Sequence, residues 1–347
     1  MNAPKVSILV PIYNVSQYIE RSARSLFGQT MEDLEYIFVD DCSPDNSVEI
    51  LKQVLEEYPL RKGQVKILHH EKNSGTPQAR KDAIHAAQGE YILHVDSDDY
   101  LDVNMVEKLY AKALEDDADI VACDFFVKSE DSQRRIIVAP DGIGENGMKF
   151  RDDTLNRVGW PNVWFRLTKR SLYAFVEGYW PKSNNSEDTV ITIITTFFAK
   201  KISYVDEPLY YYWQNINSVT HAHTAKVEIS NQLDRRHNIW IIEKFLKANQ
   251  AEKQYFKGIV TEKSYCRNQL LTYSKDLRCW WLWMTMFPGL NWLLFWGNRQ
   301  VKSTYREKLW FLSIASGLYP KLKKKLLHKK YRPALIWRAG IRQESLT

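Results

Sequence analysis

One stretch organises this sequence of 347 residues: Tyr91-Ile92-Leu93-His94-Val95-Asp96-Ser97-Asp98-Asp99-Tyr100. Its first five residues favour a β-strand, and three carboxylates follow within four positions. Carboxylates this close repel one another, so the arrangement is costly unless a cation shares the charge. The stretch therefore predicts a strand that ends at a divalent metal site.

Two other interpretations of the acidic stretch stay open. A solvated turn is the simpler one. A calcium loop is the other, because acidic residues alternate from Asp96 and Glu107 stands at the twelfth place. Such a loop needs Gly at its sixth place, where Leu101 stands, so calcium is disfavoured.

Composition is typical of a globular protein, with 44% apolar and 26% charged residues. The formal charge of +6 is concentrated in Lys and Arg residues from Arg299 onward, which indicates an anionic surface as a partner. The four cysteines form no Cys-x-x-Cys pair, and the N-terminus enters a strand without a secretory leader. We expect a reducing, cytoplasmic location.

Strand and helix patterns alternate along the first part of the chain. Buried strands are predicted at 6–12, 36–41, 65–68, 91–95 and 119–123, with helices at 19–26, 48–55, 77–87 and 103–114. This order predicts an α/β fold with a doubly wound mixed sheet. The sequence has neither a Gly-x-Gly-x-x-Gly after the first strand nor a Gly-x-x-x-x-Gly-Lys, so a dinucleotide fold or a P-loop is not expected.

Polar clusters follow three of the predicted strands. Pro11 to Tyr13, Asp40-Asp41 and Asp96 to Asp98 stand where strands end. Ligands of doubly wound sheets bind beyond the carboxyl ends of the strands. We therefore expect these three clusters to meet in one crevice.

Four motifs in order carry a resemblance to a known family. They are Val6-Ser7-Ile8-Leu9-Val10-Pro11-Ile12-Tyr13-Asn14, Val39-Asp40-Asp41-Cys42-Ser43-Pro44-Asp45-Asn46-Ser47, Gly75-Thr76-Pro77-Gln78-Ala79-Arg80, and Gly89-Glu90-Tyr91-Ile92 with Asp96-Ser97-Asp98-Asp99. Together they resemble the family 2 glycosyltransferases of the GT-A fold, to near Thr220. Cys42 stands where that family usually has Gly, and Lys81 where Asn is usual.

The resemblance implies a donor site for a nucleotide sugar. Pro11 and Tyr13 would lie against the nucleoside, Asp41 would accept the imide proton of uracil, and Arg80 would reach the base or the diphosphate. Asp96 would touch the ribose or the sugar, and Asp98 would coordinate Mn²⁺ or Mg²⁺. From residue type alone, a strand-end proline, a core tyrosine, a helix-capping aspartate and a solvated arginine remain the alternatives.

The resemblance also implies an acceptor side. In Asn184-Asn185-Ser186-Glu187-Asp188 the pair Glu187-Asp188 would occupy the active site, with Asp188 as the general base of an inverting transfer. Trp164 would contact the acceptor, with packing as the alternative for such rings, and His221 would reach the metal or the diphosphate, with an incidental loop histidine as the alternative. The alternative for the acidic pair is ordinary helix-start chemistry, with Ser186 as the N-cap.

The region from 224 onward looks different from the rest. An uncharged, tryptophan-rich run from Cys279 to Trp296 is broken by Pro288-Gly289 and precedes the basic stretch 321–330. Tryptophan favours membrane interfaces and basic residues favour anionic lipid, so we expect two short segments on a membrane surface. The alternative is a helical lid with core tryptophans. Nucleic acid is not expected, because the aromatic and basic runs are successive rather than interleaved.

These observations divide the chain into a GT-A catalytic domain (1–223, with halves 1–123 and 124–223) and a helical, membrane-associating extension (224–347). The expected function is a metal-dependent transfer from a UDP-sugar to a glycolipid or a growing surface polysaccharide, such as lipopolysaccharide or capsule, at the inner face of the cell membrane. A non-catalytic binding module and a sugar nucleotidyltransferase remain as alternatives.

Overall fold

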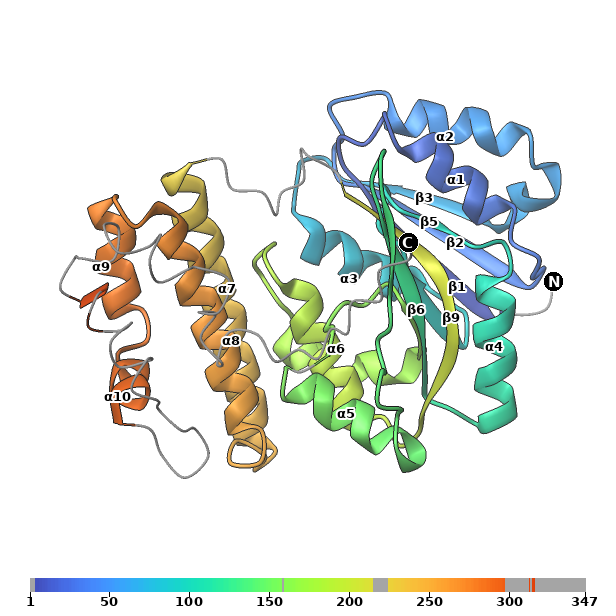
Figure 1. Cartoon of the computed structure of the whole chain (residues 1–347). Helices are drawn as coiled ribbons and strands as arrows, with labels where there is room; N and C mark the ends of the chain where they lie inside the picture. The colour runs from blue at the N-terminus through green and yellow to red at the C-terminus, as the bar shows by residue number, and fades with distance from the viewer. Residues whose placement is uncertain (1–3, 158, 215–223, 297–311, 313, 316–347) are drawn as a thin grey trace. The chain divides into compact units, whose positions relative to one another are not determined.

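The structure is a computed structural model that describes residues 4–157, 159–214, 224–296, 312 and 314–315 (Figure 1). These residues form two compact units. The first unit holds described residues 4–152 and 160–214, and the second holds 153–157, 159 and the residues from 224 onward. The sequence placed a single boundary after residue 223 and did not assign 153–159 to the helical region.

The first unit is built on one sheet with helices on both sides. Its strands are β1 (Val6–Ile12), β2 (Leu34–Asp40), β3 (Val65–His69), β4 (Tyr91–His94), β5 (Tyr100–Leu101), β6 (Ile120–Lys128), β7 (Gln133–Ile136), β8 (Arg166–Lys169) and β9 (Ile202–Trp213). Its helices are α1 (Ile19–Phe27), α2 (Ser47–Glu56), α3 (Thr76–Ala86), α4 (Met105–Asp116), α5 (Met148–Leu155), which crosses into the second unit, and α6 (Glu187–Phe198).

The described strands form a mixed sheet in the order β3-β2-β1-β4-β8-β6-β9-β5, with β7 added alongside β6. Strands β1 to β4 are parallel, whereas β8 pairs antiparallel with both β4 and β6. The predicted doubly wound mixed sheet is thus confirmed. Because β1, β2 and β4 are parallel, their carboxyl ends lie on the same edge and bring the polar clusters after Ile12, Asp40 and His94 together.

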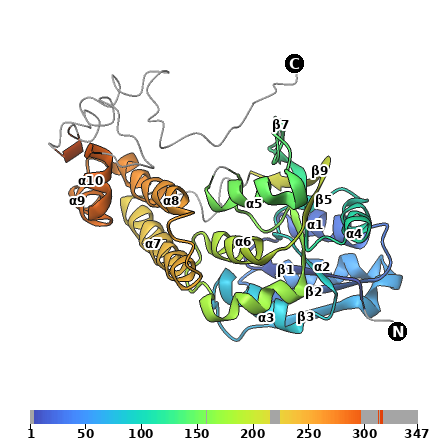
Figure 2. The same ribbon diagram turned by 90° about the horizontal axis from the view of Figure 1, so that it is seen from below.

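The sheet edge is held in place by an apolar core. Nearly continuous β-branched and aliphatic residues make β1 buried on both faces, as expected for a central parallel strand. In Figure 1, α1 and α4 lie on one side of the sheet and α3 and α6 on the other; Figure 2 gives the same molecule turned by 90°. Rigid strands therefore carry the residues that lie at their ends.

One predicted strand is longer than the sequence indicated. The pattern predicted a strand over 119–123, but β6 continues to Lys128. It does so because its second half pairs with β9 as far as Trp213 and with β7 through Gln133–Ile136. Distant partners supply the hydrogen bonds that a short apolar run does not reveal.

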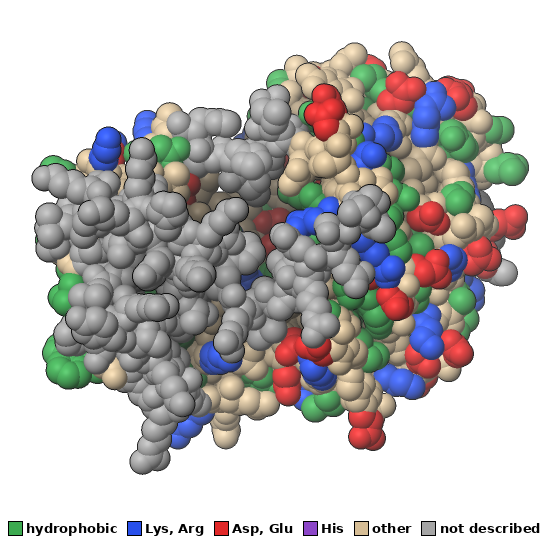
Figure 3. Space-filling model, viewed as in Figure 1, with side chains coloured by type: hydrophobic (Ala, Val, Ile, Leu, Met, Phe, Trp, Pro, Cys, Tyr) green, Lys and Arg blue, Asp and Glu red, His purple; other side chains and the backbone are tan. Residues whose placement is uncertain are grey.

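The surface of the first unit carries both positively and negatively charged side chains. On the face that Figure 3 shows, Lys and Arg side chains alternate with Asp and Glu side chains over the described residues. Interspersed charges of both signs are those of an ordinary solvated surface. The chemistry is therefore to be sought at the sheet edge.

The second unit is helical, with α7 (Ala225–Ala248), α8 (Phe256–Gln269), α9 (Leu277–Thr285) and α10 (Pro288–Trp296). The tryptophan-rich run is two short helices, and Pro288 begins the second of them, where a proline is well tolerated. Cys266, Cys279 and Trp283 lie in its core. None of the described helices combines the length and hydropathy needed to cross a bilayer.

Candidate active site

The acidic turn after β4 contains two kinds of carboxylate. Asp96 and Asp98 are partly exposed, whereas Asp99 is fully buried. The Tyr210 hydroxyl donates to Oδ2 of Asp99 over 2.6 Å, and the backbone N–H of Trp213 donates to Oδ1 over 2.7 Å. Burial, together with Asp98 and Asp96, raises the pKa of Asp99 well above its usual range. Asp99 thus anchors the turn to β9, while Asp96 and Asp98 are partly exposed.

Arg21 of α1 supports the same turn from the other side. Its Nη2 donates to the backbone carbonyl of Asp98 over 3.0 Å. The guanidinium lies 4.6 Å from the ring centroid of Tyr100 and 4.1 Å from that of Trp213. A cation between two aromatic faces and a carbonyl is firmly held, so Arg21 fixes the backbone that presents Asp98.

Arg80 of α3 joins two acidic segments that are far apart in the sequence. The side chain is 3% exposed. Its Nη2 donates to Oδ1 of Asp96 over 2.7 Å, and its Nε donates to Oε1 of Glu187 over 3.4 Å. Asp96, Glu187 and Asp188 together outweigh burial and raise the pKa of Arg80. This guanidinium therefore ties the turn after β4 to the start of α6.

The start of α6 carries the expected acidic pair. Ser186 precedes the helix with a φ of 65° and makes no side-chain capping bond, so the alternative of an ordinary serine N-cap is wrong. Burial and the neighbouring Asp188 raise the pKa of Glu187 to about 8, although Arg80 opposes this shift. Glu187 is therefore a poor candidate for the base.

Asp188 is held in a different way. Its Oδ2 accepts a hydrogen bond of 2.9 Å from Nδ2 of Asn162, and its Oδ1 accepts one of 2.7 Å from the backbone N–H of Thr189. Two neutral donors orient a carboxylate without transferring a proton to it. Asp188 is thus fixed in direction while Arg80 is bonded to Glu187 beside it.

The pKa of the Tyr212 phenol in β9 is raised by burial and then by Asp99, Asp98, Asp96 and Asp188. This agrees with the Arg80 bridge, which contacts both Asp96 and Glu187. The turn after β4 and the start of α6 therefore meet.

The loop before α3 closes onto the loop before α6. Gly75 has a φ of 87°, and a Cβ added there would lie 2.3 Å from Oδ1 of Asn184. Only glycine allows this approach without strain. Contact between these two loops agrees with the bridge made by Arg80.

The remaining donor-side residues lie at the same sheet edge. Pro11 lies near the carboxyl end of β1. Tyr13 comes directly after this strand and is 47% exposed. Asp41 is buried: its Oδ1 accepts from the Ser74 N–H and lies 2.7 Å from Nδ1 of His70, and its Oδ2 accepts from the Gly75 N–H. Asp41 therefore orders the loop at Gly75, and a contact with a base would share this carboxylate.

Two expectations from the sequence need correction. Arg80 is not the solvated helix charge that its residue type allowed; it is buried among carboxylates. Trp164 is not an open platform for an acceptor, because it is 3% exposed and stacks on Tyr210 with ring centroids 4.5 Å apart. Covered aromatic faces pack a core and cannot bind a sugar. His221 lies outside the described residues.

Sequence reasoning also missed residues that support the site. Arg21, Asn162 and Tyr210 contact the acidic groups, but each comes from an element that looks ordinary in the sequence. Asp99 was part of the acidic run and received no role. The position of Asp99 in the turn could have predicted its burial, because a carboxylate that faces the sheet from a turn is buried.

A divalent ion at these residues would need oxygen atoms of a bound substrate to complete its coordination. Within the residues that the structure describes, no group of three or more His, Cys, Asp or Glu side chains could hold a metal ion. Mg²⁺ and similar ions are commonly bound by one or two carboxylates plus substrate phosphates. The partly exposed Asp98 suits that arrangement.

The fold defines a class of protein, those with the GT-A fold. Residues 1–349 of TarS of S. aureus, in complex with UDP-GlcNAc, share this fold with a TM-score of 0.54 and 15% identity, over 94% of this chain and 93% of that one. The mannosyltransferase PcManGT of Pyrobaculum calidifontis, in complex with GDP-Man and Mn²⁺, gives a TM-score of 0.51 with 16% identity, over 95% and 89%.

The chain belongs to glycosyl transferase family 2, whose profile matches residues 7–175. Glycosyltransferase EpsH of Bacillus subtilis is 30% identical over 274 residues, which is 77% of each chain. Glycosyltransferase EpsJ of the same organism is 34% identical over 227 residues, 62% of this chain and 63% of EpsJ. The match thus spans less than two thirds of the length of EpsJ. Members of this family are enzymes that transfer sugars, which confirms the resemblance seen in the motifs.

Proposed function

We propose that the protein is an inverting glycosyltransferase that uses a UDP-sugar. The observation that carries this proposal is Arg80, which is bonded both to Asp96 of the donor-side turn and to Glu187 beside Asp188. A donor at the turn would therefore lie next to the carboxylate that receives a proton. TarS, a structural neighbour, is described with UDP-GlcNAc.

In this proposal Asp188 acts as the general base. It takes the proton of the acceptor hydroxyl while that oxygen bonds to the anomeric carbon of the sugar. The bond from this carbon to the diphosphate breaks on the opposite side, UDP departs with the bonding electrons, and the anomeric configuration inverts. The neutral donors Asn162 and Thr189 orient the Asp188 carboxylate for this role.

On the donor side, Tyr13 and Pro11 would flank the nucleoside at the end of β1, and Asp41, which holds the loop at Gly75, would accept the imide proton of uracil. Asp96 would contact the ribose or the sugar. Asp98 would coordinate Mn²⁺ or Mg²⁺ together with the diphosphate, and His221 is a further candidate ligand. When bound, such an ion neutralises the charge that builds on the departing diphosphate.

The proposed acceptor is a glycolipid or a growing surface polysaccharide, reached at the cytoplasmic face of the cell membrane. Support comes from the second unit, where large apolar side chains are exposed on α9 and α10: Leu277, Trp281, Trp292 and Trp296. The basic stretch 321–330, which lies outside the described residues, supplies charge for an anionic membrane surface.

Release of UDP tests the proposed function. The full chain is incubated with individual UDP-sugars, with and without Mn²⁺, and the nucleotide products are separated. The proposal predicts Mn²⁺-stimulated formation of UDP. A sugar nucleotidyltransferase would form pyrophosphate from a nucleoside triphosphate instead, and a non-catalytic module would bind the UDP-sugar and leave it intact; either result would replace the proposal.

A further inference from the structure

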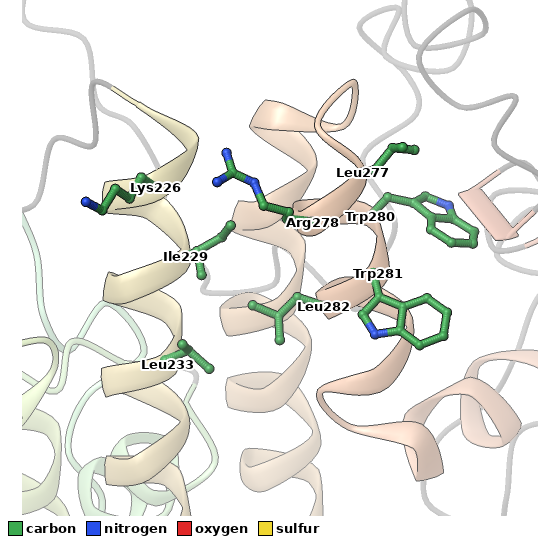
Figure 4. A pocket seen from close by; sticks show the side chains of 8 residues that line it. All are labelled: Lys226, Ile229, Leu233, Leu277, Arg278, Trp280, Trp281 and Leu282. Carbon is green, nitrogen blue, oxygen red and sulfur yellow. The ribbon is translucent and has the colours of Figure 1, made fainter.

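The second unit contains a groove that the proposed chemistry does not use. It has a volume of about 680 Å³ and is lined by residues of α7 and α9. Its walls are Ile229, Leu233, Trp280 and Leu282, with Leu277 and Trp281 at its rim (Figure 4). This volume lies within the range of sites that bind small molecules.

Charge is confined to one end of the groove. Figure 4 shows Lys226 and Arg278 near the beginnings of α7 and α9, with Leu233 and Leu282 further along the helices. Asp276 forms an ion pair of 2.7 Å with Arg278, so the three charges sum to one positive charge. The groove thus has a cationic end and an apolar length, which matches a molecule with an anionic head and a hydrocarbon tail.

The rim of the groove carries large apolar side chains that are exposed to solvent. Leu277 is 80% exposed and Trp281 is 63% exposed. Large apolar side chains gathered at one place mark a binding surface on a soluble protein. Tryptophan is enriched where hydrocarbon meets polar head groups, and no side chain of α9 after Arg278 carries a charge.

We infer that this groove binds an anionic phospholipid of the membrane, with one acyl chain along Ile229, Leu233 and Leu282 and the phosphate at Lys226 and Arg278. The inference deepens the proposed membrane-surface partner, on which it rests, by assigning the contact to particular residues. Trp281 and Leu277 enter the head-group region around the bound lipid.

Flotation with vesicles tests the inference on the full chain. Vesicles of phosphatidylcholine alone are compared with vesicles that also contain phosphatidylglycerol. The wild type is expected to float with the anionic vesicles. Lys226→Glu reverses one charge at the head-group end and is expected to weaken binding by about tenfold or more, as is the double variant Leu277→Gln/Trp281→Ala.

Matched controls lie on the same helix α7, away from the groove. Trp240→Ala removes an exposed tryptophan, and Lys247→Glu reverses the charge of an exposed lysine. Both control variants are expected to bind the anionic vesicles within about twofold of the wild type. Phosphatidylglycerol with brominated acyl chains adds a second readout. Its quenching of fluorescence should be smaller in Trp281→Phe than in the wild type, because Trp281 enters the membrane surface beside the bound lipid.

The inference would be overturned if the groove variants floated like the wild type, or if the control variants lost as much binding as the groove variants. It would also be overturned if the wild type were a dimer and the groove substitutions made it dissociate without any change in flotation. The last would assign the groove to a second copy of the chain. UDP release without vesicles is measured in parallel. A wild type that releases UDP and does not float with the anionic vesicles rejects the groove alone, whereas a wild type that floats and releases no UDP rejects the proposed function alone.

Discussion

At the scale of single residues, the neighbours of each carboxylate assign it a different task. Asp99 is buried against Tyr210, Asp96 is bonded to Arg80, and Asp188 is oriented by Asn162. Glu187 has a raised pKa and lies beside Arg80. In the proposed mechanism these four acidic residues of similar chemistry would therefore act as an anchor, a donor contact, a base and a positioning group.

Replacing the proposed base should separate binding from turnover. Asp188→Asn keeps the shape of the side chain and removes its ability to accept a proton, so kcat should fall by about 10² to 10⁴-fold. Donor affinity should stay within about twofold, because the donor contacts lie on the other side of Arg80. UDP release and titration with a UDP-sugar measure the two quantities.

The matched control is Asp117→Asn, on the exposed end of α4, where the residue is in the left-handed region that asparagine also adopts. It should leave both quantities unchanged. Normal turnover by Asp188→Asn would remove this residue from the mechanism.

The buried Glu187 should make stability depend on pH. Its pKa is about 8 in the folded protein and 4.5 in the reference state. Between these values the folded chain holds a proton that the unfolded chain has lost, so the free energy of unfolding should decrease as pH rises from about 5 to about 8. In Glu187→Gln this contribution is absent, and denaturant titrations should show a shallower decrease.

Glu115→Gln, on the exposed surface of α4, is the comparison variant and should follow the wild type. A slope in Glu187→Gln as steep as that of the wild type would mean that Glu187 is ionised throughout, and that its contact with Arg80 outweighs its burial.

At the scale of elements, the site depends on loops that meet rather than on any one of them. Gly75 begins α3 and lies against Asn184, which precedes α6. The two loops therefore fix the spacing between the helices that carry Arg80 and the acidic pair.

Gly75→Ala should disturb this spacing in two ways. A Cβ meets Oδ1 of Asn184 at 2.3 Å, and the φ of 87° is strained for alanine, by roughly 1 kcal/mol or more. The free energy of unfolding should fall and turnover should decrease. The double variant Gly75→Ala/Asn184→Ala removes the collision and should recover part of the loss, while the strain remains.

Recovery to the full stability of Asn184→Ala alone would show that φ strain is absent. No loss in Gly75→Ala would show that the loops are apart in solution. Thermal unfolding and UDP release on the four proteins of this cycle give both answers.

Local pattern predicted the elements well where the chain alone decides them. Apolar runs placed β1 at Val6–Ile12 and β4 from Tyr91, because buried parallel strands need continuous hydrophobic residues. The extension of β6 to Lys128 was missed, since its partner strand β9 comes more than seventy residues later. Pairing with distant strands is invisible to a local pattern.

At the scale of the whole molecule, the same reason explains which parts of the site could be predicted. The acidic residues were found because their position after strands is a local signal. The bridge made by Arg80 was missed, because Glu187 is 107 positions away from it. The burial of Trp164 was missed too, since its stacking partner Tyr210 lies on another strand.

The two units serve different partners in this account. The sheet edge of the first unit holds the donor and the base, while the groove of the second unit holds a lipid. Each proposal rests on contacts within its own unit. Each unit can therefore be tested without assuming the other.

The structure of the full chain with a UDP-sugar and Mn²⁺ tests the central claim most directly. The account predicts the nucleoside at Pro11 and Tyr13, the ion between Asp98 and the diphosphate, and the anomeric carbon between Asp96 and the carboxylate of Asp188. A nucleotide bound elsewhere, or a sugar whose anomeric carbon no path connects to Asp188, would contradict it.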